Sequence, residues 1–119
     1  GDVQFYELAH LEVEAETRDK SVRLKLKSFV IPSPELIPEE VRSQIRKWSD
    51  YIDYWAVDFD YNNDVFHNQW QDYRTRAKRD LALVSDWHDY VKTGEHEILV
   101  KVFDIFGNDT THLVVVKAR

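Results

Sequence analysis

The strongest chemical feature of this sequence is a cluster of cationic side chains beside two aromatic ones. Four cations occupy six positions in the segment 74–79, and Trp70 and Tyr73 precede them. Aromatic rings stack on bases and cations hold phosphates, so this combination is typical of surfaces that contact nucleic acid. Two other interpretations fit: a solvated loop or edge strand whose charges block edge-to-edge pairing, or contact with a protein or neighbouring domain. The candidate residues for nucleic-acid or partner binding are Trp70, Tyr73, Arg74, Arg76, Lys78 and Arg79.

A second polar segment has the spacing with which a calcium loop opens. Oxygen-bearing side chains occupy four alternate positions, at Asp58, Asp60, Asn62 and Asp64. The sixth position of such a loop would be Asn63 instead of glycine, and the twelfth would be Gln69 instead of a bidentate glutamate. The segment also begins inside an expected strand. We therefore predict a polar turn and no metal.

No arrangement of residues in the sequence predicts catalysis. The five histidines are His10, His67, His88, His96 and His112. They form neither a His-x-x-x-His pair on a helix nor a set completed by glutamates. Cysteine is absent, and no Gly-x-Ser-x-Gly elbow is present to activate a serine. We expect structural or surface histidines, no enzyme activity and no cofactor.

Length and composition limit the remaining possibilities. The 119 residues suffice for one domain, spanning 1–119. A net charge of −6 makes the average surface repel nucleic acid, so any such contact must be local. The absence of cysteine excludes disulfides and favours a cytoplasmic location. The longest uncharged apolar run, Leu113–Val116, is too short to span a membrane, so no membrane partner is expected.

Two alternating segments predict a hairpin at the start of the chain. In 11–16 apolar residues alternate with glutamates, and in 22–27 they alternate with arginine and lysines. Antiparallel pairing would set an acidic outer face beside a basic one, with each pair contributing about 0.2–1 kcal/mol. The turn is expected at Thr17–Ser21.

A short helix is predicted over about 38–50. Pro38 can serve as the first helical residue, and two glutamates follow it at the positive end of the helix. Val41, Ile45 and Trp48 then share one face over about two turns.

The rest of the sequence predicts short strands separated by turns. Strands are expected at 54–60, 65–73, 81–84, 98–102 and 113–117, with turns at Asn62–Asp64 and Phe106–Asp109. Trp55 is the expected central core aromatic, Trp70 and Trp87 are expected to be partly exposed, and Tyr90 could pin a crossover through its hydroxyl. These features predict a mostly β chain, an immunoglobulin-like antiparallel β-sandwich with one short inserted helix.

The second half of the chain resembles polycystic-kidney-disease (PKD) repeats. The resemblance rests on His88–Tyr90, Gly94, Ile98–Asp104 and the turn at Phe106–Asn108, and on the strand from Tyr54 to Asp60. His96 stands where that family usually has an aromatic tyrosine, and the glycine after the tryptophan strand is missing. The resemblance implies a PKD-like sandwich.

Longer segments resemble the C-terminal tail of some site-specific adenine DNA methyltransferases of restriction-modification type. They are Phe29–Pro32, Trp48–Trp55, Phe66–Trp70, Tyr73–Arg76 and Asp104–Thr111. The catalytic motifs of that class, Asp-Pro-Pro-Tyr and Phe-x-Gly-x-Gly, are absent. The resemblance therefore implies a tail without the methylase.

Two functions follow as expectations. The first is a non-catalytic accessory module of a DNA-modification protein, which docks the parent methyltransferase domains, a partner subunit or, weakly, DNA. The alternative is an extracellular PKD-like adhesion or spacer module of a cell-surface protein.

Overall fold

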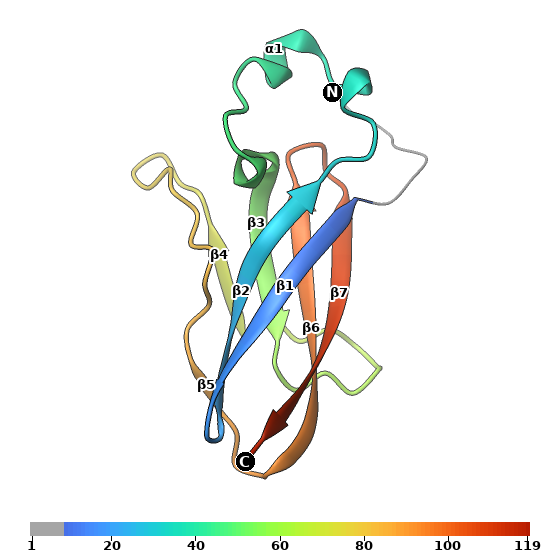
Figure 1. The fold of residues 1–119 in the computed structure, drawn as a ribbon. Helices are drawn as coiled ribbons and strands as arrows, with labels where there is room; N and C mark the ends of the chain where they lie inside the picture. The colour runs from blue at the N-terminus through green and yellow to red at the C-terminus, as the bar shows by residue number, and fades with distance from the viewer. Residues whose placement is uncertain (1–8) are drawn as a thin grey trace.

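The computed structural model describes residues 9–119, which form two antiparallel sheets packed face to face (Figure 1). One sheet has the order β1-β2-β5, with β1 at His10–Arg18, β2 at Ser21–Val30 and β5 at His88–Asp89. The other has the order β4-β3-β6-β7, with β4 at Trp70–Tyr73, β3 at Ile52–Asp58, β6 at Gly94–Asp104 and β7 at Asp109–Ala118. The predicted immunoglobulin-like sandwich is confirmed.

The β1–β2 hairpin has the predicted charge pairing on its outer face. Arg23 Nε lies 2.6 Å from a carboxylate oxygen of Glu16, and Lys27 Nζ lies 3.4 Å from one of Glu14. The turn is tighter than expected, because the strands continue to Arg18 and resume at Ser21. Asp19 takes a left-handed conformation at φ 55°, which aspartate tolerates in tight turns.

The helix expected over 38–50 is two short helices with an irregular segment between them. The α-helix α1 spans only Glu39–Arg42, and the 3-10 helix η2 spans Trp48–Tyr51; a further 3-10 turn, η1, covers Pro34–Leu36. Asp50 explains the break, since its carboxylate accepts the backbone N–H groups of Arg46 and Lys47 at 2.9 and 3.2 Å. The apolar spacing of Val41, Ile45 and Trp48 is therefore not a continuous helical face. This insert covers one end of the sandwich (Figure 1).

Two expected strands are shorter than their sequence patterns suggest. Of 65–73 only β4 pairs with β3. The segment 81–84 forms a single bridge, between Val84 and Lys25. It still follows β2, because Leu26 donates its N–H to Leu83 and Ser85 donates its N–H to Leu24, both at 2.8 Å.

The core lies between the sheets and centres on Trp55. The neighbouring strands β3 and β6 direct Trp55, Val57, Ile98, Val100 and Val102 inward, and each of these residues is fully buried. The Trp55 indole N–H donates to the Ala82 carbonyl at 2.8 Å, so the one polar atom of that side chain is satisfied. Trp55 is the predicted central aromatic. Between residues 9 and 119, no helix has the length and apolar character needed to cross a bilayer.

Candidate functional site

The cationic segment follows β4 at the edge of the four-stranded sheet, and its residues point in different directions. Trp70 faces inward and packs edge-on against Trp55, with ring centroids 4.7 Å apart. Tyr73 lies on the outer face and is 50% exposed. Of the two aromatic side chains, Tyr73 is thus the one available to a partner.

Arg74 is bound to the backbone of its own domain. Its guanidinium donates to the carbonyl oxygens of Ser49 at 2.8 Å, Arg79 at 2.5 Å and Ile52 at 3.3 Å. These bonds hold the loop after β4 against the beginning of β3 and against η2. The planar fork of arginine suits several carbonyl acceptors at once, which lysine cannot match.

Lys78 is paired with Asp72. Its ammonium group lies 2.8 Å from one carboxylate oxygen and 3.1 Å from the other. Partial burial alone would raise the pKa of Asp72, but the hydrogen bonds from Lys78 and from the Ala82 N–H, with the lysine charge, hold that pKa below its usual value. Within residues 9–119, Arg76 and Arg79 are the cations of the cluster whose side chains make no hydrogen bond or ion pair.

A pocket of about 480 Å³ lies between this loop and the insert. Arg74 and Arg79 line it from the loop, Lys47 and Asp50 line it from the insert, and Asp53 lines it from β3. Burial raises the pKa of Asp50, but the N–H donors of Arg46 and Lys47 and the charges of Lys47 and Arg74 outweigh it and lower that pKa. Sequence reasoning missed this pocket because its walls come from segments far apart in the chain. Asp53 occupies the irregularity in the β3–β6 register, a feature that strand pairing creates and that the sequence does not show.

The calcium-like segment is a polar turn whose carboxylates bind the loop itself. Asp58, which is buried, accepts the N–H of Asp60 at 3.0 Å and that of His67 at 2.8 Å. Asp60 accepts the side-chain amide of Gln69 at 2.9 Å. Asn63, in the turn expected at Asn62–Asp64, takes a left-handed conformation at φ 64°, which asparagine tolerates. Residues 9–119 contain no cluster of three or more metal-ligating side chains.

Two histidines belong to an aromatic stack around Tyr90. His88 stacks on Phe59 with centroids 4.5 Å apart, and His96 stacks on Tyr90 with centroids 3.8 Å apart. The Tyr90 hydroxyl donates to the Phe59 carbonyl at 2.6 Å, which ties the segment before β6 to the end of β3. Tyr90 thus has the predicted pinning contact.

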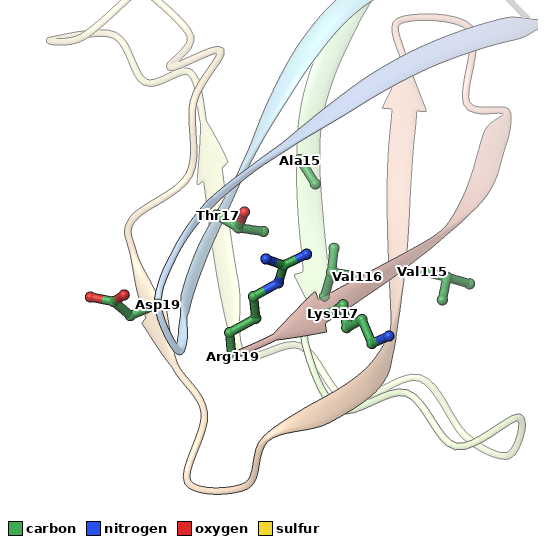
Figure 2. A pocket seen from close by; sticks show the side chains of 7 residues that line it. All are labelled: Ala15, Thr17, Asp19, Val115, Val116, Lys117 and Arg119. Carbon is green, nitrogen blue, oxygen red and sulfur yellow. The ribbon is translucent and has the colours of Figure 1, made fainter.

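A second cavity, of about 430 Å³, opens between the edge strands of the two sheets (Figure 2). Ala15, Thr17 and Asp19 line it from β1 and the following turn, and Val115–Lys117 line it from β7 together with Arg119. The Arg119 N–H donates to the Asp19 carbonyl at 3.1 Å and closes one end. None of the residues predicted from the sequence to bind a partner lines this cavity.

Comparison with solved structures identifies the fold. The chain is similar to the PKD1 domain of the Vibrio cholerae metalloprotease PrtV, with 14% identity, a TM-score of 0.52 and coverage of 91% of this chain and 93% of that one. It is also similar to the PKD1 domain of Vibrio anguillarum Epp, with 12% identity, a TM-score of 0.53 and 95% coverage of both chains. The fold is PKD-like. No family model and no curated protein matches the sequence.

These comparisons revise two expectations. The resemblance to the tails of adenine methyltransferases receives no support from them. The predicted cytoplasmic location is contradicted, because the two PKD-like neighbours, one of them a metalloprotease domain, point away from the cytoplasm. The physical reason is that absent cysteine says little about compartment when a buried core such as that around Trp55 needs no disulfide.

Proposed function

We propose that this domain is a non-catalytic spacer or adhesion module of an extracellular or cell-surface protein. The observation that carries the proposal is the PKD-like fold, which matches the two bacterial PKD1 domains over more than nine-tenths of this chain. The charged side chains of Asp58, Arg74 and Asp72 support a non-catalytic role, because they form hydrogen bonds within the domain itself.

The shape of the domain also supports a spacer. The longest dimension is 49 Å, against 33 and 21 Å in the other directions. The described chain enters β1 near the end that carries the insert and leaves β7 at the opposite end (Figure 1). Joined end to end, modules with this arrangement would each add length between their neighbours.

The surface proposed to contact a partner is the exposed part of the cationic loop. Tyr73, Arg76 and Arg79 combine a large ring with two unpaired cations, a composition favoured in protein interfaces. Arg79 also lines the pocket beside the insert. A partner that presents acidic side chains around an apolar residue would match this surface.

Surface labelling tests the compartment. An antibody against the domain should stain intact cells of the source organism, and external protease should remove the signal. Signal obtained only after lysis would overturn the extracellular proposal.

The purified domain should also show no turnover with generic ester or phosphoester substrates, or with DNA and a methyl donor. Reproducible turnover abolished by one substitution would overturn the accessory role.

A further inference from the structure

Three aromatic side chains form a row across the outer face of the four-stranded sheet. Tyr54 of β3 lies directly opposite Tyr73 of β4 on one side and Phe103 of β6 on the other. The rings of Tyr54 and Phe103 are stacked, with centroids 4.2 Å apart and an interplanar angle of 13°. Rings that stack across neighbouring strands stand upright on the sheet, so the second face of Tyr54 is turned toward β4 and Tyr73.

A cavity of about 420 Å³ lies at that second face. Tyr54 and Tyr73 line it from neighbouring strands, Gln71 lines it from the same face of β4, and Asp53 and Arg74 line it at one end. Within residues 9–119 the two tyrosine rings do not stack on each other, so the cavity is a slot with a ring on each of two strands. We call this cavity the tyrosine slot.

The tyrosine slot presents hydrogen-bond donors that the domain itself does not use. In the described part of the chain, the hydroxyls of Tyr54 and Tyr73 make no hydrogen bond. The side-chain oxygen of Gln71 accepts from the Asn68 amide at 2.6 Å, which leaves the Gln71 amide nitrogen to donate to a ligand. A ligand that fits this slot therefore carries free acceptors and a compact apolar group for the ring faces.

The tyrosine slot continues toward the insert. The cavity of about 480 Å³ beside the insert shares the lining residues Asp53 and Arg74 with it. Val41, Ile45 and Ile105 give that second cavity apolar side chains, and Ile105 is 41% exposed. Two adjoining cavities of this kind suit an extended segment better than one small molecule.

We propose that the tyrosine slot binds a proline of an extended, acidic segment of a partner protein. The inference rests on the partner surface of the proposed function and names the apolar residue at its centre. Proline has no N–H, so it requires no acceptor from the slot, and its ring packs against aromatic faces. A polyproline II segment makes no internal hydrogen bonds, which leaves its carbonyl oxygens free for the Tyr54 and Tyr73 hydroxyls and the Gln71 amide.

The charges beside the slot favour acidic residues next to the proline. Arg74 lines the slot but donates to three carbonyls of its own domain. Arg76 and Arg79 follow it in the loop, and within residues 9–119 their side chains make no ion pair. Carboxylates on the bound segment would pair with these two guanidinium groups. Because the polyproline II helix is already formed in the free segment, little conformational entropy is lost on binding.

Fluorescence anisotropy with synthetic labelled peptides tests the proposal. The peptide Glu-Pro-Pro-Pro-Pro-Glu should bind the wild-type domain saturably. The matched peptide Glu-Ala-Ala-Ala-Ala-Glu has the same charge but no proline, and it should bind at least about tenfold more weakly. The peptide Lys-Pro-Pro-Pro-Pro-Lys reverses the charge and should also bind more weakly, because it meets the loop cations.

Variants of the slot place the contact. Tyr73→Ala should weaken binding of the glutamate-flanked proline peptide by at least about tenfold, because it removes one ring of the slot. Tyr54→Phe keeps the ring stacked on Phe103 and removes only a donor, so the loss should be about two- to tenfold. Tyr61→Ala is the matched control, because Tyr61 is a partly exposed tyrosine beyond the end of β3. Thermal unfolding of each variant establishes that it is folded.

The outcomes separate the slot from the acidic partner. Absence of saturable binding by the wild type at about 1 mM peptide would overturn the proposal. Equal binding of the alanine peptide would also overturn it, while the acidic-partner surface of the proposed function would stand. Equal binding of the lysine-flanked peptide would overturn the acidic partner and leave the proline slot. Binding unaffected by Tyr73→Ala in a folded variant would exclude the tyrosine slot as the site.

Discussion

Tyr90 donates its hydroxyl hydrogen to the backbone carbonyl of Phe59 at 2.6 Å, across 31 residues of sequence. Both side chains are buried, and His88 and His96 stack on their rings. Burial, together with the negative charges of Asp60 and Asp58, raises the pKa of Tyr90 well above its usual value, so the hydroxyl keeps its proton. The bond joins the end of the central strand β3 to the segment that leads into β6.

Tyr90→Phe should therefore lower the free energy of unfolding by about 1–3 kcal/mol, because it leaves a buried carbonyl without its donor. The wild-type protein should also lose stability above about pH 10, where the unfolded chain releases the tyrosine proton that the folded chain retains. Tyr90→Phe should lose less over that alkaline range. Urea unfolding at neutral and alkaline pH measures both effects, and identical alkaline slopes in the two proteins would contradict the assignment.

Trp55→Ala should destabilise the domain by about 3–5 kcal/mol, because it empties a large volume at the centre of the core and frees the Ala82 carbonyl. Trp87→Ala is the control. The Trp87 ring is partly exposed, with the guanidinium carbons of Arg18 and Arg23 4.4 and 4.6 Å from its centroid, so its loss should cost about 1–2 kcal/mol. Near-normal thermal stability of Trp55→Ala would mean that the β3 register is wrong by one residue.

The sequence predicted the β1–β2 hairpin well because both signals for it are local. Alternating apolar positions fix which face is buried, and opposite charges on the outer faces fix the pairing of the strands. The helix over 38–50 was less predictable: the spacing of Val41, Ile45 and Trp48 is helical, but the carboxylate of Asp50 binds two backbone N–H groups and ends the helical path. Competition between a side chain and the helix for backbone donors is not visible in a hydrophobic period.

The cationic cluster is a second case in which the sequence pattern did not reveal contacts made within the fold. Its composition predicted a basic patch, yet Arg74 and Lys78 are taken up by partners within the domain. Ser49 and Ile52 lie more than twenty residues before Arg74, so only the fold brings these acceptors to it.

Arg74→Ala should lower the free energy of unfolding by about 1–3 kcal/mol, since it removes the donor shared by Ser49 and Ile52. Arg74→Lys should recover only part of that loss, because an ammonium group cannot reach several carbonyls in a planar fork. Arg76→Ala, at an exposed position in the same loop, should stay within about 0.5 kcal/mol of wild type. Chemical denaturation of the three variants measures this order, and equal effects at positions 74 and 76 would contradict a structural role for Arg74.

Asp104 should make the domain less stable as pH rises through the acid range. Burial raises the pKa of its carboxyl above the usual value, although the backbone N–H groups of Phe106 and Asn108 donate to it at 2.9 and 3.0 Å. Between the usual and the raised pKa the folded chain holds a proton that the unfolded chain has released, so stability falls with rising pH. Asp104→Asn should remove this component and be at least as stable as wild type near neutral pH. Unfolding measured from about pH 4 to about pH 7 compares the two profiles, and a steeper fall in the variant would contradict the sign.

Nucleic-acid binding by the cationic loop should be weak, because only Arg76 and Arg79 remain unpaired among its cations within residues 9–119. Two phosphate contacts imply a log–log salt slope of no more than about −1.8 on duplex DNA, since each neutralised phosphate contributes about −0.9. The net charge of −6 should keep the affinity no tighter than about 10⁻⁴–10⁻⁶ M. Fluorescence anisotropy with labelled duplex and single strands, titrated with salt, measures the slope.

The double variant Arg76→Ala/Arg79→Ala should abolish this binding and leave the fold intact, because exposed charges contribute little to stability. Arg42→Ala is the matched control: it also removes one exposed arginine, but from an ion pair with Glu39 on the insert, 2.6 Å from nitrogen to oxygen. Its anisotropy curve should follow that of the wild type. Binding retained by the double variant would place the contact on another surface. Absence of binding by the wild type at low salt would remove nucleic acid as a direct partner and leave Tyr73, Arg76 and Arg79 as a surface for protein.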